Sequence, residues 1–114
     1  DMSFFTQQTR VILIDEAHSI TVRKPTSAER NQIRDAIMPV VHDDNQVATR
    51  IMAMAPRMLI VGWSGPGFEG RPVTAKNIDA LPPEVVDATL PVLIPWTTEG
   101  LAPDLKKESG GDTN

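Results

Sequence analysis

The chain has 114 residues, of which 40% are apolar and 23% charged, with a formal net charge of −4 and no cysteine. This length suits one domain with a modest core, and the acidic balance argues against non-specific nucleic-acid binding. The lack of cysteine excludes disulfides, thiolate catalysis and cysteine-based metal sites. No apolar run approaches the roughly 18 residues of a membrane span, and no signal-peptide pattern opens the chain. We therefore expect a cytosolic protein with no nucleic-acid or membrane partner.

The octet "VILIDEAH" (11–18) permits two interpretations. In a DEAH-type motor, Asp15 would bind Mg²⁺, Glu16 would orient the attacking water and His18 would couple the site to nucleic acid. That chemistry needs an upstream phosphate-binding loop, and the only glycine-rich stretch, residues 62–70, lies downstream and lacks Gly-Lys-Ser/Thr. The second interpretation is simpler, because β-branched residues on both sides of Asp15–His18 predict two antiparallel strands and a hairpin over 9–24.

The next segments predict two main helices. Thr26 and Glu29 form a capping box at the start of a helix over 26–41, and its expected apolar stripe runs from Ala28 through Ile33 and Ile37 to Val40 or Val41. Pro39 should end or kink that helix, and the polar stretch 42–45 supplies a turn and a new N-cap. A second helix is expected over 46–61, bent by Pro56, although "MLIVGW" (58–63) also suits a strand. The conformation of 57–63 stays open at this stage.

The C-terminal half predicts shorter elements. Residues 64–72 form a loop, Thr74 caps a helix over 75–81, and a further helix over 84–95 is made irregular by Pro91. The polar residues 97–114 predict a flexible tail. Together these elements predict an α+β, mostly α fold, in which an N-terminal β-hairpin precedes a small bundle of three to four helices within one globular domain, residues 1–96.

No constellation for catalysis or for binding a metal or cofactor is evident. His18 and His42 have no neighbour at the spacing of a metal site or catalytic triad, and the paired carboxylates suit helix caps and solvated turns. We therefore expect a protein that is not an enzyme and that uses no cofactor or metal.

Several side chains suit contact with an apolar partner instead. Methionine is flexible and polarizable, and Met52 and Met54 cannot both point inward on one helix. Trp63 and Phe68 flank the glycine loop and are suited to anchor it on the body of the protein. The candidate partner-binding residues are Met52, Met54, Met58, Trp63 and Phe68.

Residues 20–30 ("ITVRKPTSAER") and 61–85 ("VGWSGPGFEGRPVTAKNIDALPPEV") resemble the tail assembly chaperones of long-tailed bacteriophages. These proteins commonly combine a strand leading into an "xVRxPTxxER"-like helix start with "VxxWxG", a "DGxPV"-like turn and a short "T/S-xENIxAL" helix followed by proline. The resemblance covers about residues 10 to 90. The chain departs from the pattern at Lys76, where an acidic residue is usual, and in the prolines at 39, 56 and 91.

The resemblance implies a mostly helical protein with an N-terminal hairpin that binds the tape-measure protein and helps to recruit tail-tube subunits in the host cytoplasm. Self-association is a further candidate interaction of this chain. A virion structural or adaptor protein of the tail is the alternative function, and a fragment of a DEAH-type ATPase is a remote one.

Overall fold

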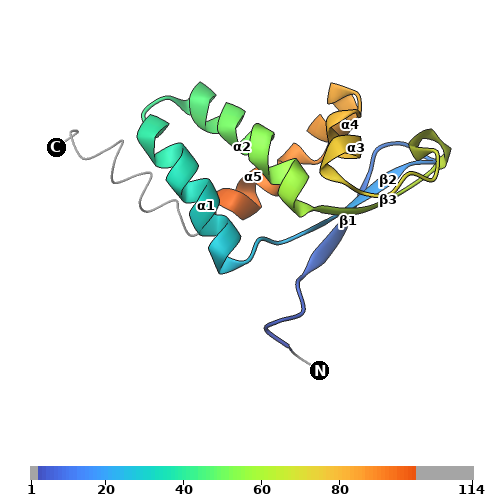
Figure 1. Cartoon of the computed structure of the whole chain (residues 1–114), viewed down its shortest axis with the longest axis horizontal. Helices are drawn as coiled ribbons and strands as arrows, with labels where there is room; N and C mark the ends of the chain where they lie inside the picture. The colour runs from blue at the N-terminus through green and yellow to red at the C-terminus, as the bar shows by residue number, and fades with distance from the viewer. Residues whose placement is uncertain (1–2, 100–114) are drawn as a thin grey trace.

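The computed structural model describes residues 3–99 and has an α+β, mostly α architecture, as the sequence predicts (Figure 1). A three-stranded antiparallel sheet is combined with five α-helices and two short 3-10 turns. In chain order the elements are β1 (Thr9–Leu13), β2 (Ser19–Arg23), α1 (Ser27–Ile37), η1 (Met38–Val40), α2 (Asp44–Leu59), β3 (Ile60–Ser64), η2 (Pro66–Phe68), α3 (Ala75–Asp79), α4 (Pro83–Asp87) and α5 (Leu90–Thr98).

The predicted hairpin is confirmed, and a third strand extends it. Strands β1 and β2 pair in antiparallel register from Thr9 opposite Arg23 to Leu13 opposite Ser19, and β3 pairs with the other edge of β2. The helix expected over 46–61 is therefore wrong in its last two residues: α2 ends at Leu59, and Ile60 is already extended. Residues 60–61 are β-branched, and the free edge of β2 lies beside them. Pairing with this edge supplies hydrogen-bond partners for backbone groups of the strand once the helix has ended.

The junction between β2 and α1 is fastened by an ion pair and a capping box. Arg23 donates to both carboxylate oxygens of Glu29, at 2.7 and 2.6 Å, and also to the carbonyl of Met58 near the end of α2, at 3.2 Å. The predicted capping box is confirmed, because Thr26 Oγ1 accepts from the Glu29 N–H and the Glu29 carboxylate accepts from the Thr26 N–H. The Arg23 guanidinium lowers the pKa of Glu29 to about 2.

Prolines set the ends of the helices, and the expected effect of Pro39 is confirmed. The helix expected over 26–41 ends at Ile37, and Pro39 lies in the 3-10 turn η1 that follows. The helix expected over 84–95 is two helices, α4 and α5, because Pro91 lies in the first turn of α5, where its missing N–H leaves no hydrogen bond unmade. Pro56 lies inside α2, near its C-terminal end.

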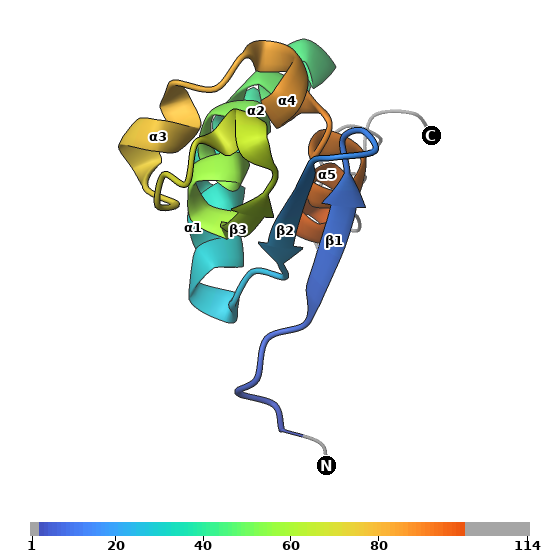
Figure 2. The ribbon, with the colours of Figure 1, turned by 90° about the vertical axis from the view of Figure 1, so that its right-hand side faces the viewer.

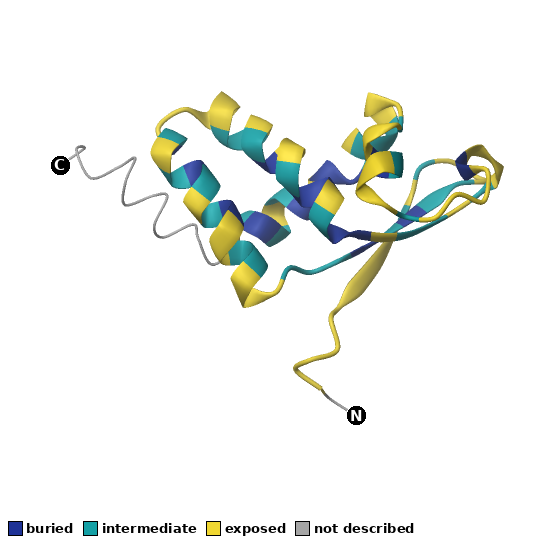
Figure 3. Ribbon diagram, in the orientation of Figure 1, coloured by how far each residue is buried: buried dark blue, intermediate teal, exposed yellow. Residues whose placement is uncertain are grey.

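The helices gather on one face of the sheet, with α1, α2 and α5 behind it in Figure 2. The core joins β2 and β3 to these three helices (Figure 3). Ala28, expected in the buried stripe of α1, is exposed, because the first turn of α1 projects beyond the core. The fully buried side chains of the core include Ile20, Val22, Ile33, Ile37, Ala55, Leu59 and Leu93.

The last helix reaches into the segment expected to be a tail. Residues Thr97 and Thr98 belong to α5, and Thr97 is fully buried, with its hydroxyl donating to the carbonyls of Leu93 and Ile94. A threonine hydroxyl that bonds to its own helix can be buried at little cost, so its polarity is a poor sign of exposure. The rest of the expected tail, residues 100–114, lies outside the described residues. Among residues 3–99, no helix has the length and apolar character to cross a bilayer.

Candidate partner-binding site

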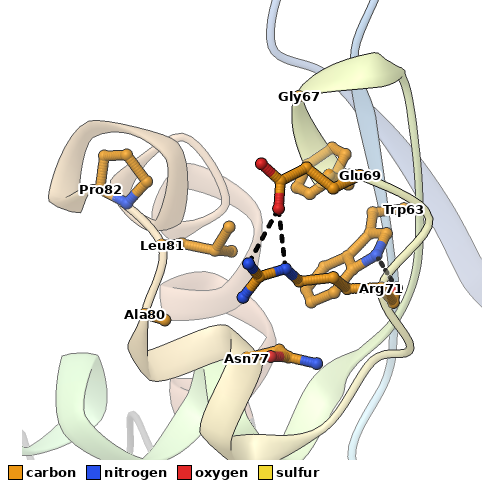
Figure 4. A pocket seen from close by; sticks show the side chains of 9 residues that line it. Trp63, Gly67, Glu69, Arg71, Asn77, Ala80, Leu81 and Pro82 are labelled. Carbon is orange, nitrogen blue, oxygen red and sulfur yellow. Dashed lines mark hydrogen bonds and ion pairs between the residues drawn. The ribbon is translucent and has the colours of Figure 1, made fainter.

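The loop between β3 and α3 is folded back on itself by two aromatic side chains. Trp63 stacks on Phe68, with ring centroids 4.9 Å apart and planes 3° from parallel. The indole N–H of Trp63 donates to the carbonyl of Arg71 at 2.8 Å, which closes the loop (Figure 4). Phe68 is only 6% exposed, whereas Trp63 is half-buried. Both side chains therefore anchor the loop, and Trp63 still presents part of its surface to solvent.

The tip of the β1–β2 hairpin is bonded to this loop through His18. The Asp15 carboxylate accepts from the backbone N–H groups of Ala17 and His18, at 2.8 and 2.9 Å, and from the His18 ring Nδ1 at 2.8 Å. The other ring nitrogen, Nε2, accepts from the Gly67 N–H at 2.8 Å. An accepting Nε2 requires the neutral ring with its proton on Nδ1, so the two bonds fix the tautomer.

The DEAH letters therefore form a hairpin turn, as the simpler interpretation predicts. The sequence analysis does not give His18 a hydrogen-bond partner, whereas in the structure Asp15 and Gly67 hold its two ring nitrogens. The spacing Asp-x-x-His across a tight turn is the sequence signal for the first contact. The hydrogen bond from His18 lowers the pKa of Asp15, and the backbone N–H groups act in the same direction.

Close packing around His18 explains why positions 65 and 67 of the loop are glycine. A Cβ atom at Gly65 would come within 2.4 Å of the His18 ring and 2.6 Å of the Ala17 carbonyl, and Gly65 also has a φ of +130°. A Cβ atom at Gly67 would lie 2.7 Å from His18 Nε2. Glycine at these positions therefore lets the hairpin tip and the loop touch.

A two-part hollow, here called the Phe68 groove, lies between this loop and the turn from α3 to α4. Each part has a volume of about 230 Å³, and both are bordered by Gly67, Phe68, Leu81 and Pro82. The first part is also lined by Trp63, Glu69, Arg71, Asn77 and Ala80, several of which Figure 4 shows turned toward the hollow. The second part is also lined by Ile14, Asp15, His18 and Val85.

One ion pair stands at the rim of the groove. Arg71 and Glu69 approach to 2.9 Å, and their side chains are 58% and 63% exposed. Such a solvated pair is weak, typically ~0–1 kcal/mol, so either side chain can turn toward a ligand at small cost. The groove thus combines apolar lining residues with an exposed ion pair at its edge, which is the composition of many recognition sites.

The three methionines of the candidate set lie elsewhere. Met52 faces solvent on α2, with 42% of its surface exposed, whereas Met54 and Met58 are half-buried against the core. None of them borders the Phe68 groove. The structure therefore brings Trp63 and Phe68 together with residues that the sequence analysis does not include among the partner-binding candidates, chiefly His18, Arg71 and Leu81. It separates them from Met52.

No family model, no curated protein and no solved structure matches this chain.

Proposed function

We propose that this chain is a bacteriophage tail assembly chaperone that binds apolar segments of the tape-measure protein in the host cytoplasm and helps to recruit tail-tube subunits. One observation carries the proposal. The segment most similar to such chaperones, residues 61–85, supplies both walls of the Phe68 groove, from Trp63 on one side to Leu81 and Pro82 on the other. The pattern that marks the family resemblance is thus also the segment that builds the hollow.

The second stretch of resemblance, residues 20–30, has a bracing role. Arg23 and Glu29 join the sheet to α1, and Thr26 caps that helix. The sheet in turn carries the hairpin tip, whose His18 is bonded to the loop at Gly67. The two segments that resemble the chaperones therefore contribute to one structure. Residues 61–85 form the groove, and residues 20–30 hold the sheet that supports it.

The chemistry of the groove suits a helical apolar ligand. An amphipathic helix is recognised when its apolar side chains enter a hydrophobic groove at intervals of three or four residues. The stacked pair of Trp63 and Phe68, together with Leu81, offers such a surface, and its two parts of about 230 Å³ each could receive successive side chains. Met52 on α2 would then be a second, separate contact.

Co-expression with the tape-measure protein tests the proposal. Ala80 is exposed and lines the groove, so Ala80→Arg should fill the hollow without disturbing the core. Ala53 is exposed on α2, next to Met52, and Ala53→Arg is the matched control. We expect the unmodified chain to keep the tape-measure protein in the soluble fraction, Ala80→Arg to lose this effect, and Ala53→Arg to retain it.

Three results would count against the proposal or its site. If the unmodified chain leaves the tape-measure protein insoluble, the chaperone function is refuted. If Ala53→Arg or Met52→Asp abolishes the effect and Ala80→Arg does not, the contact lies on α2. If the chain is found at a fixed copy number in purified mature particles, it is a virion component, because an assembly chaperone leaves before the particle is complete.

A further inference from the structure

One hydrogen bond, from the Gly67 N–H to Nε2 of His18, joins the hairpin tip (residues 14–18) to the loop (residues 65–71). Within the part of the chain that the structure describes, it is the single hydrogen bond between these two segments. A backbone N–H can only donate, so Nε2 must accept. The Asp15 carboxylate, whose pKa is lowered, can only accept from Nδ1. The bond to Gly67 therefore exists only while the His18 ring is neutral.

Protonation of the ring turns this contact from attraction into repulsion. Histidine is the side chain that gains its proton between about pH 8 and pH 5, and the His18 side chain is 24% exposed, so water reaches it. In the protonated ring Nε2 carries a hydrogen, and this hydrogen points at the Gly67 N–H. Asp15 keeps its bond to Nδ1 in both states and favours the imidazolium. The ring therefore stays on the hairpin, and the loop is the partner that is released.

The other charges near this contact lie in solvent. Asp15 is the one charged residue besides His18 that lines the second part of the Phe68 groove. Within residues 3–99, the charged residues of the hairpin tip, the loop, α3 and α4 that do not bond to the His18 ring are all exposed: Glu16, Glu69, Arg71, Lys76, Asp79, Glu84 and Asp87. The charge state of this contact thus depends mainly on His18 and Asp15.

We propose that His18 is an acid-operated latch, which joins the hairpin tip to the β3–α3 loop at neutral pH and releases the loop when its ring is protonated. The second part of the Phe68 groove lies between the two segments, with Ile14 and His18 on one side and Gly67 and Phe68 on the other. The His18 ring also meets the Phe68 ring in a T-shaped contact, with centroids 5.9 Å apart. Release of the latch therefore widens this part of the groove. A role in freeing a bound partner rests on the function proposed above, whereas the latch itself is a property of the chain alone.

Each side of the latch has bonds of its own that do not involve the ring of His18 as an acceptor. In the tip, the Asp15 carboxylate accepts from two backbone N–H groups, and the Ile14 N–H donates to the His18 carbonyl at 2.9 Å. In the loop, the indole N–H of Trp63 donates to the Arg71 carbonyl. The released state is therefore a local separation of two folded segments, and the helical circular dichroism signal should not change with it.

Nuclear magnetic resonance of the isolated chain, with no tape-measure protein present, tests the latch. Between about pH 7.5 and about pH 5, the protection factor of the Gly67 N–H against hydrogen exchange should fall about tenfold or more, with the midpoint of the His18 ring titration. His18→Gln keeps an acceptor oxygen for Gly67 but cannot titrate, so this fall should disappear. His42 is the other histidine and is exposed, and His42→Gln, the matched control, should leave the transition unchanged.

Asp15→Asn tests the part of the latch that holds the ring on the hairpin. The amide keeps an acceptor oxygen for Nδ1 but carries no charge, so the Gly67 transition should move to lower pH. The proposal is overturned if ring nitrogen shifts place the proton on Nε2 at neutral pH, or if the ring is protonated while Gly67 protection stays constant. It is equally overturned if His18→Gln shows the transition of the unmodified chain. Because no partner is present, an intact transition supports the latch whatever the co-expression result, so the two proposals fail separately.

Discussion

At the scale of single residues, Arg23 forms hydrogen bonds with three different residues. Its guanidinium bonds the Glu29 carboxylate, the Lys24 carbonyl and the Met58 carbonyl, so one side chain ties β2 to the start of α1 and the end of α2. The sequence predicts the capping role of Glu29 from its spacing to Thr26. It does not predict the ion pair, because a strand and a helix separated by a turn have no fixed side-chain spacing.

This pair predicts a pH dependence of stability. Because the pKa of Glu29 falls from 4.5 to about 2 on folding, its stabilising contribution is complete above about pH 4.5 and is lost as the pH falls toward 2. The shift corresponds to at most about 3.4 kcal/mol, at 1.36 kcal/mol per pKa unit. Glu29→Gln should therefore lower the free energy of unfolding by about 2 kcal/mol at pH 7 and by much less at pH 2, as urea titrations can measure.

The exposed pair of Glu69 and Arg71 provides the control. It joins the same two residue types at 2.9 Å, but more than half of each side chain is in solvent. Glu69→Gln should therefore change the free energy of unfolding by less than about 0.5 kcal/mol at either pH. Equal losses for Glu29→Gln and Glu69→Gln would show that the Arg23 contact adds nothing beyond a surface ion pair.

At the scale of elements, the hairpin tip and the β3–α3 loop form one unit. The sequence predicts the turn at Asp15 and the loop at 64–72 separately, from local residue types. It cannot predict that His18 joins them, because Gly67 lies 49 residues further along the chain. The same limit applies to β3, where the strand conformation is decided by the free edge of β2 and not by the residues of 60–64 alone.

Gly65 should be the most sensitive position of this unit. Gly65→Ala forces a side chain into a backbone region that L-residues rarely adopt and against both the His18 ring and the Ala17 carbonyl. We expect a loss of about 2–4 kcal/mol in the free energy of unfolding. Gly70→Ala is the control, because Gly70 has a φ of +67° but no atom within 4 Å of the added Cβ, so only about 1–2 kcal/mol should be lost.

A structural probe separates this account from a general loss of stability. The indole N–H resonance of Trp63 should shift in Gly65→Ala, because displacement of the loop alters the hydrogen bond to the Arg71 carbonyl. The same resonance should be unchanged in Gly70→Ala at temperatures where both variants are folded. Identical spectra for the two variants would contradict a role of Gly65 in placing the loop.

At the scale of the whole molecule, one core connects the helices to the groove. The cluster of buried side chains includes Leu93 of α5, Leu59 of α2 and Ile20 of β2, and it extends to Phe68 in the loop. The apolar spacing of the first main helix predicts two members of this cluster, Ile33 and Ile37. The sequence does not predict that α5 begins at Leu90 or that Thr97 is buried. Both features depend on how α5 packs against the other helices, which local residue types do not determine.

A shared core predicts that α5 and the groove unfold together. Leu93 is fully buried, so Leu93→Ala should cost about 3 kcal/mol, whereas Val92→Ala, at a half-buried site of the same helix, should cost about 1 kcal/mol. In a Trp96→Phe background only Trp63 reports by fluorescence. Urea transitions followed by Trp63 fluorescence and by far-UV circular dichroism should then coincide, and both should shift equally in Leu93→Ala. A Trp63 transition that stays in place while the helical signal moves would show that the groove and the helices are separate folding units.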